Sequence, residues 1–158
     1  AGFAGALADR LRVGDVLIAD EVLDRSGNAW PTTWPGETKC ATPRGRLLSS
    51  DELIATREMK GDLGARFDAL AVDMESAAFA ARCTEVGVPF GCVRAISDDS
   101  ATELSPALLT LLADGKTPIW RVLAALAHRP TLFPELLRLA RDTRLASIRL
   151  AAALDRLC

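Results

Sequence analysis

Two acidic side chains stand where the pattern of the sequence changes, and their chemistry suits cleavage of a glycosidic bond. Glu75 opens an Ala-rich helical pattern, and Asp98 closes an apolar run. Glycosidic cleavage passes through an oxocarbenium-like sugar, whose positive charge a nearby anion stabilises. We interpret Glu75 as a bidentate acceptor for two sugar hydroxyls, with Met74 packed on the sugar face. Asp98, in an apolar setting that favours the protonated carboxyl group, would donate to the leaving group, and Ser97 would orient it.

The same acids also have purely structural explanations. Glu75 is equally an acid at a helix N-terminus, where the helix dipole favours negative charge. Asp98 is equally a cap for the loop that follows it. On spacing alone, these structural roles are favoured.

The two acids depend for their placement on the strand, helix and strand predicted within residues 69–98. Apolar runs at 69–72 and 90–96 predict the strands, and the Ala-rich segment between them predicts the helix. A crossover of this length predicts a parallel pair of neighbouring strands with a right-handed connection. Ligands of open α/β sheets bind at the carboxyl ends of such strands. We therefore expect Glu75 and Asp98 to face one crevice.

The remaining chain predicts further elements and one long loop. Gly2 and Gly5 predict a tight turn with close backbone approach. Residues 24–43 contain three Pro and two Gly and predict the loop, on which Trp30 and Trp34 either pack on the body or cover an apolar ligand. Strands are predicted at 16–23 and 45–50, and helices at 106–112, 118–127 and 134–157. Residues 54–67 predict one helix, or two short ones broken near Gly61 and Gly64.

Composition and length predict one soluble globular domain. The chain has 158 residues, 49% of them hydrophobic, and no apolar run near the roughly 18 residues that span a bilayer. Its four cysteines form no CxxC pair and it has one histidine, so we expect free thiols in a reducing cytoplasm and neither metal nor cofactor. No basic patch is interleaved with aromatic residues, so we expect no nucleic-acid partner.

The predicted helix 134–157 is amphipathic and basic. Leucine and alanine recur on one face, whereas Arg138, Arg141 and Arg149 lie on the other. One interpretation is packing on its own domain or on a second subunit. The other is peripheral contact with an anionic membrane surface.

The segments VDMESAAFA (72–80) and GVPFGCVRAISD (87–98) resemble the signature of the nucleoside phosphorylase and nucleosidase superfamily. That group holds purine nucleoside phosphorylases and the nucleosidases of methylthioadenosine and S-adenosylhomocysteine. The opening AGFAGALADRLRVGDVLIADEVL is similar to the family segment in which a Gly-rich turn runs into a strand. The resemblance implies a three-layer α/β/α fold with a central mixed sheet and a long C-terminal helix. It implies one domain over 1–158, with 117–158 as a helical extension.

The resemblance also implies roles for the paired residues. Met74 and Glu75 would hold the ribose, and Ser97 and Asp98 would end the strand that meets the purine. Asp98 would protonate or hydrogen-bond ring nitrogen 7 of the base, and phosphate or water would then attack the anomeric carbon. Inorganic phosphate is therefore expected as a co-substrate, as the alternative to water, and not as a cofactor. We also expect Asp73 to bind the substrate.

Three departures from the family pattern affect these expectations. Phe3 stands where many phosphorylases place a Ser or Thr that contacts phosphate, so the phosphate site is unassigned apart from the Gly5 region. Leu53 stands where an aromatic residue that stacks on the purine is expected, which implies an aliphatic wall. Family members begin with a further strand-rich segment, so we expect a chain truncated at its N-terminus and weak or inactive in isolation.

Two classes of function follow. The first is an enzyme, a glycosyltransferase of the nucleoside phosphorylase type, that cleaves the N-glycosidic bond of an adenosine-type nucleoside. Residues 122–150 are similar to the tail of hopanoid-associated phosphorylases, which implies adenosylhopane as one substrate. The alternative is a non-catalytic, truncated module for purine-nucleoside binding or dimerisation. In both cases we expect a homo-oligomer.

Overall fold

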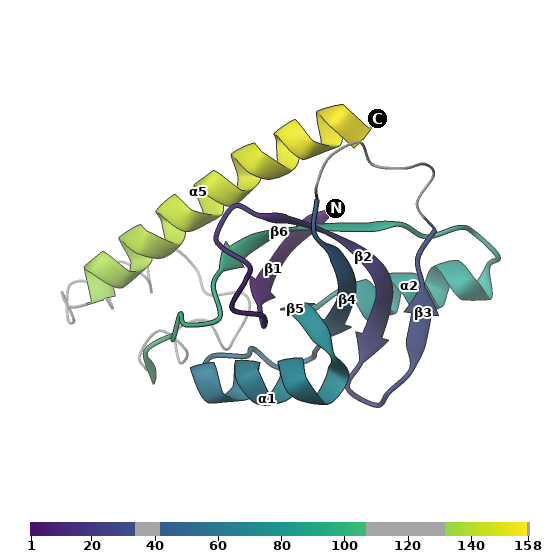
Figure 1. Ribbon diagram of the computed structural model, residues 1–158, viewed down its shortest axis with the longest axis horizontal. Helices are drawn as coiled ribbons and strands as arrows, with labels where there is room; N and C mark the ends of the chain where they lie inside the picture. Colours follow the sequence, from purple (N-terminus) through teal and green to yellow (C-terminus); the bar gives the residue numbers. More distant parts are fainter. Residues whose placement is uncertain (34–41, 107–131, 158) are drawn as a thin grey trace, which may run out of the picture.

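The computed structural model describes residues 1–33, 42–106 and 132–157, and a six-stranded mixed sheet forms its centre (Figure 1). The strands are β1 (Gly2–Ala6), β2 (Val16–Asp24), β3 (Ala29–Pro31), β4 (Arg44–Ser49), β5 (Ala69–Asp73) and β6 (Cys92–Asp98). They lie in the order β3-β2-β4-β5-β1-β6, and β2 also pairs with β6. The five strands β2, β4, β5, β1 and β6 therefore close into a ring, and β3 pairs with β2 beside it.

Three helices of the described chain pack on these strands. They are α1 (Arg57–Phe67), α2 (Ser76–Glu85) and α5 (Leu132–Leu157). The long helix α5 crosses β6 and β2, α1 lies beside β5, and α2 contacts β2, β3 and β4. Figure 1 shows α1 and α5 on opposite sides of the strands.

Helix α1 has well-defined ends. The hydroxyl of Thr56 accepts a hydrogen bond from the Met59 amide at 3.2 Å, which satisfies one of the free N–H groups of the first turn. Asp68 ends the helix in the left-handed conformation, with φ of 50°. Between these ends, Lys60 and Leu63 are the buried residues of the helix.

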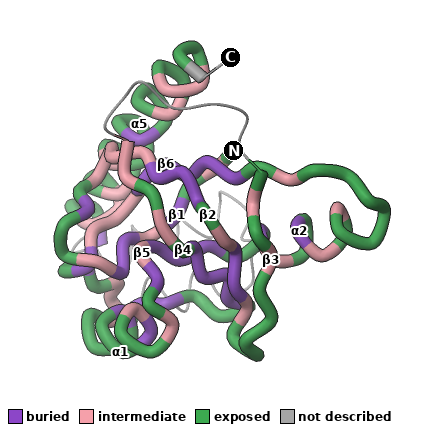
Figure 2. Tube along the Cα trace, turned by 45° about the vertical axis from the view of Figure 1, so that its right-hand side comes forward, coloured by how far each residue is buried: buried purple, intermediate pink, exposed green. Residues whose placement is uncertain are grey.

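The buried residues concentrate on the strands (Figure 2). The larger cluster joins side chains of β1, β2, β4, β5, α2 and β6, including Leu17, Leu47 and Ile96. The smaller cluster lies between α1 and the strands and includes Leu48 and Leu63. Both clusters consist mainly of alanine, leucine and β-branched residues, as expected for strands covered by helices.

The predicted mixed sheet with flanking helices and a long C-terminal helix is confirmed. The strands predicted at 16–23 and 45–50 are β2 and β4, the helix predicted within 54–67 is α1, and the helix predicted at 134–157 is α5. The ends differ from prediction by a few residues. Assignment of the whole chain to one domain, with an extension at 117–158, stays a prediction.

The predicted parallel pairing of 69–72 with 90–96 is wrong. Strand β1 lies between β5 and β6, antiparallel to the first and parallel to the second. Gly5 nevertheless pairs with Val72 on one side and with Asp98 on the other. The ends of β5 and β6 therefore meet across Gly5, because a strand distant in sequence is inserted between them.

The turn predicted at Gly2 and Gly5 is also wrong, because both residues belong to β1. The predicted close approach is confirmed. A Cβ atom at Gly2 would lie 2.6 Å from Nη1 of Arg94, and one at Gly5 would lie 2.8 Å from Oδ2 of Asp98. The glycines thus leave room for side chains of β6 that cross β1.

The loop predicted at 24–43 is partly wrong, because Ala29–Pro31 forms β3 and pairs antiparallel with β2. Trp30 packs against the larger buried cluster, which confirms the packing interpretation for that residue. Trp34 lies outside the described residues. The two helices predicted at 106–112 and 118–127 also lie outside the described residues, apart from residue 106.

The structure bears on the predictions for the cysteines and for membrane-spanning helices. Cys83 and Cys92 are free thiols, as predicted, whereas Cys40 and Cys158 lie outside the described residues. In the described ranges no helix combines the length and apolar character that a membrane crossing requires.

Candidate functional site

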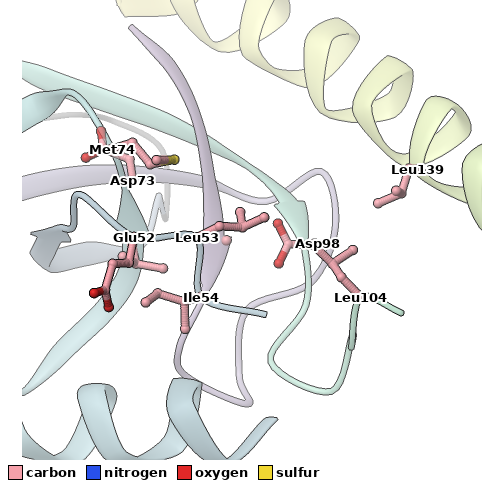
Figure 3. Close-up of a pocket in the computed structure, with 10 residues that line it drawn as sticks. Glu52, Leu53, Ile54, Asp73, Met74, Asp98, Leu104 and Leu139 are labelled. Atoms are coloured by element: carbon pink, nitrogen blue, oxygen red, sulfur yellow. The ribbon is translucent and has the colours of Figure 1, made fainter. Parts of the chain in front are cut away.

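A cavity of about 140 Å³ opens where the ends of β5 and β6 meet across Gly5 (Figure 3). Its walls come from β1, from the segment before α1, from the end of β5, from β6 and the chain after it, and from α5. The lining residues are Gly5, Glu52, Leu53, Ile54, Val72, Asp73, Met74, Asp98, Leu104 and Leu139. Asp98, Met74, Leu53 and Asp73, predicted from the sequence, thus border one cavity.

Asp98 is held on both carboxylate oxygens. The hydroxyl of Ser97 donates to Oδ1 at 2.9 Å, so the orienting contact predicted for Ser97 is present. Nζ of Lys60 donates to Oδ2 at 2.6 Å. The purely apolar setting predicted for Asp98 is therefore wrong, because an ammonium group from α1 reaches it. The Asp98 side chain remains 26% exposed.

Sequence reasoning missed Lys60, although a signal was present. Lys60 precedes Leu63 by three positions and Phe67 by seven, which places it on the inward face of the predicted helix. A lysine at a core-facing position is rarely buried unless it is paired. That pattern predicts an acidic partner, but it does not identify which acid is the partner.

The walls beside Asp98 are aliphatic. Figure 3 shows the side chain of Leu53 extending toward the Asp98 carboxyl group. Ile54, Leu104 and Leu139 contribute further apolar surface, and Leu139 belongs to α5. Such a pocket, in which apolar walls lie beside the Asp98 carboxyl group, is typical of sites for small organic ligands. Leu53 lies where an aliphatic wall was predicted.

Met74 and Glu75 differ in their placement. Met74 lines the cavity and is 48% exposed. It also borders a second, wider hollow of about 380 Å³ between α2 and the β2–β3 turn. Glu75 is exposed, stands at the N-cap of α2 without a capping side-chain hydrogen bond, and is absent from the lining of both hollows. Its predicted contact with a sugar stays a prediction.

Asp73 borders the cavity, but its carboxylate oxygens are engaged in an internal network. Nε of Arg94 donates to Oδ2 at 2.7 Å, and the amide of Ser76 donates to Oδ1 at 3.2 Å. The Ser76 hydroxyl donates to Oδ2 of Asp73 and accepts from Nη2 of Arg94 at 2.7 Å. The network joins β5, α2 and β6, so the predicted contact of Asp73 with substrate stays a prediction.

The charges around the cavity bear on the phosphate prediction. Among the described residues, the lining contains the acids Glu52, Asp73 and Asp98 but no arginine or lysine. All three hydrogens of the nearby Lys60 ammonium are directed to protein acceptors. The Gly5 region therefore presents a carboxylate to the cavity rather than a cation. Within the described ranges, no group of His, Cys, Asp and Glu side chains is arranged to hold a metal ion.

Comparison with known proteins adds family information to this geometry. Residues 35–115, about half of the chain, match the family described as the phosphorylase superfamily. A 5′-methylthioadenosine/S-adenosylhomocysteine nucleosidase of Staphylococcus aureus (strain JH9) is 31% identical over 123 residues, covering 61% of this chain and 54% of that protein. The chain thus spans about half the length of the curated relatives it matches.

Two solved structures from Helicobacter pylori are similar in fold. One is a 5′-methylthioadenosine/S-adenosylhomocysteine nucleosidase in complex with an amino-pyrrolopyrimidine joined to a pyrrolidinol. It is 27% identical with a TM-score of 0.57, and the match covers 64% of this chain and 54% of that one. The other is a futalosine hydrolase, 26% identical with a TM-score of 0.57, over the same shares of the two chains.

Proposed function

The chain belongs to the phosphorylase superfamily, and on that premise we propose that the cavity beside Asp98 binds the purine of a nucleoside whose N-glycosidic bond the protein cleaves. One observation carries the proposal: a carboxyl group held by Ser97 and Lys60 borders an aliphatic cavity. A purine has two apolar faces and a polar edge, so it suits these walls and the Asp98 carboxyl group. The Helicobacter pylori nucleosidase, which binds a compound with a purine-like ring, supports the same ligand class.

In the proposed reaction Asp98 acts in its protonated form and hydrogen-bonds or protonates ring nitrogen 7 of the base. The bond between the anomeric carbon and the base breaks, and its electron pair moves into the purine ring. A proton at nitrogen 7 offsets that developing negative charge. An oxygen of water or phosphate then bonds to the anomeric carbon, and the proton that an attacking water loses passes to the Asp98 carboxylate or to solvent. Met74 and Glu75 are proposed to contact the ribose, as the family resemblance implies.

We favour water as the nucleophile. Each of the three acids in the described lining is paired with a cation that lies outside it, so the described lining offers an incoming phosphate no cation of its own. The relatives named above are a nucleosidase and a hydrolase. Phosphate stays the alternative co-substrate, and phosphate dependence of the rate decides between the two.

A lipid-tailed nucleoside such as adenosylhopane is a narrower proposal. It is supported by α5, which carries Leu139 into the cavity wall and exposes Phe133, Leu137 and Ile148. The same helix is proposed to contact a membrane surface, and retention on anionic vesicles at low salt tests that contact. We also propose that the protein forms a homo-oligomer and is located in the cytoplasm.

The test is release of free adenine by the purified full-length protein. The substrates are 5′-methylthioadenosine, S-adenosylhomocysteine and an adenosine with an apolar 5′ substituent, each with and without phosphate. Asp98→Asn should lower kcat by roughly 10²–10⁴-fold, because the asparagine cannot supply a proton. Asp62→Asn, which changes an exposed acid of α1, is the matched control and should leave the rate unchanged.

Two results would contradict this assignment. An unaltered rate in Asp98→Asn would remove Asp98 from the reaction. Binding of adenine without release from any of the three substrates would favour the alternative, a non-catalytic module that keeps a purine pocket.

A further inference from the structure

We propose that Lys60 is a positioning residue that holds the Asp98 carboxyl group in one orientation toward the cavity. The inference rests on the proposed function, because it assigns Lys60 a part in the reaction through Asp98. Lys60 lies on α1, thirty-eight positions before Asp98, and its side chain is 2% exposed. It is absent from the cavity lining, so any effect on a ligand passes through the residues that it holds.

The Lys60 ammonium group is fully engaged by protein acceptors. It donates to Oδ2 of Asp98 at 2.6 Å, to the carbonyl of Asp99 at 2.8 Å and to the carbonyl of Thr102 at 3.1 Å. An ammonium group has three hydrogens, and each has an acceptor here. The ammonium is thus fixed in direction as well as in place, and the turn after β6 is tied to α1.

Helix α1 is itself placed so that Lys60 faces inward. The cap at Thr56 sets where the helix begins, and Leu63, one turn after Lys60, anchors the same face in the smaller buried cluster. The lysine therefore extends from a fixed base. A charge-assisted bond of this kind is about twice as strong as a bond between neutral groups.

Two hydrogen bonds and the space at Gly5 together restrict the Asp98 carboxyl group. Lys60 holds Oδ2 and the Ser97 hydroxyl holds Oδ1. The missing Cβ of Gly5 leaves the space that the carboxyl group occupies above β1. Rotation about the Cβ–Cγ bond would break both hydrogen bonds. The carboxyl group is therefore oriented before a ligand arrives, and such preorganisation lowers an activation barrier.

Burial of a lysine here needs an explanation beyond stability. A buried ion pair is often no more stable than apolar side chains of similar size, because desolvation of both charges offsets their attraction. A methionine at position 60 would fill a similar volume without that cost. A role in orienting Asp98 accounts for the charge, whereas simple filling of the core does not.

The first experiment compares Lys60→Met with Arg57→Met in the full-length protein. Both variants replace a basic residue of α1 with methionine, but Arg57 is exposed. Lys60→Met should lower kcat by roughly 10–100-fold and change KM less than about threefold, because a misplaced acid affects the chemical step more than binding. Lys60→Arg, which keeps the charge, should recover part of the loss. Wild-type kcat in a folded Lys60→Met protein would overturn the proposal.

The second experiment is a double-mutant cycle with Asp98→Ala. If Lys60 acts through Asp98, Lys60→Met should cost no further activity in the Asp98→Ala background. A loss of equal size in both backgrounds would show a general structural role and would overturn the proposal. The double variant contains no unpaired charge at this place. If Lys60→Met alone does not fold, the double variant serves as the folded reference. Lys60→Arg then takes the place of Lys60→Met in the cycle.

Calorimetry with adenine separates this inference from the proposed function. Wild-type protein that binds adenine but releases none from nucleosides would contradict the reaction and not the role of Lys60. In that case Lys60→Met should weaken adenine binding only slightly, by up to about threefold, and this effect should vanish in Asp98→Ala. Equal weakening in both backgrounds would overturn the role of Lys60. Wild-type protein that neither binds adenine nor releases it would overturn both proposals.

Discussion

Two pairs of opposite charge, Asp73 with Arg94 and Asp98 with Lys60, are built in the same way and differ in access to solvent. In each pair, a side chain of β6 occupies space that a glycine of β1 leaves free. The guanidinium of Arg94 lies at Gly2, and the carboxyl group of Asp98 lies at Gly5. Both pairs have short contacts, of 2.7 Å and 2.6 Å.

The difference lies in the acid. The Asp73 side chain is 1% exposed and Arg94 is 9% exposed, so that pair is sealed. The Asp98 side chain is 26% exposed, whereas its partner Lys60 is 2% exposed. The first pair therefore joins β5, α2 and β6. The second fixes a charged partner behind a carboxyl group that a ligand can still reach.

Breaking the sealed pair should have the largest effect on stability. Arg94→Met leaves the Asp73 carboxylate buried without a counter-charge, and such a loss costs about 3–5 kcal/mol. Urea unfolding followed by circular dichroism measures the change. Arg82→Met, which removes an exposed ion pair with Glu85, is the control and should cost less than about 1 kcal/mol. Equal midpoints for the two variants would contradict the distinction between sealed and exposed pairs.

Filling the space beside the open pair should have a smaller effect, mainly on rate. Alanine at position 5 would place its Cβ 2.8 Å from Oδ2 of Asp98, so the carboxyl group must move. We expect roughly a tenfold loss of kcat, because each 1.36 kcal/mol of barrier is a factor of ten. Gly61→Ala is the matched control, since no atom lies within 4 Å of the added Cβ. It should keep the rate and stabilise α1 by up to about 1 kcal/mol.

The smallest effect concerns Asp24, an acid in the β2–β3 turn without a buried partner. Burial acts to raise its pKa, but hydrogen bonds from the Asn28 side chain and from the amides of Asn28, Ser26 and Gly27 outweigh it. The pKa of Asp24 therefore lies below its ordinary value of 3.8. The folded state then binds the proton less readily than the unfolded state. The resulting stability is present above about pH 4 and is lost as the pH falls through the folded-state pKa.

Asp24→Asn tests this effect through unfolding midpoints between pH 2 and pH 6. The variant should be less stable than the wild type by under about 0.5 kcal/mol near pH 6, because water screens so exposed a carboxylate. The difference should disappear toward pH 2. A difference that grows on acidification would show that the sign is wrong.

Local patterns in the sequence predicted most elements of the fold. Alternation and caps located β2, β4, α1 and α5 within a few residues, because these signals depend on neighbours in the chain. The pairing of strands was not accessible in this way. Residues 69–72 and 90–96 were predicted as a parallel pair, yet β1, which carries two glycines and was predicted as a turn, lies between them. Which strands pair depends on contacts between distant segments.

The candidate site was predictable to a similar extent. Asp98, Ser97, Met74 and Leu53 were identified from motif and resemblance, and the structure brings these residues together at one place. Lys60 was not identified, because its meaning depends on an acid that is distant in sequence. Charge patterns show that a buried lysine needs a partner, but only the fold shows which acid lies at the end of its side chain.

The closed ring of strands also limits how a ligand reaches the cavity. An open sheet has two free edges and can flex along them, so a binding crevice can widen by splaying neighbouring strands. In a ring, each of the five strands is hydrogen-bonded on both sides, and separating any two of them breaks a ladder. A ligand therefore enters the cavity past segments outside the ring and not between its strands. These segments are the chain before α1, the chain after β6, and the side of α5 that carries Leu139.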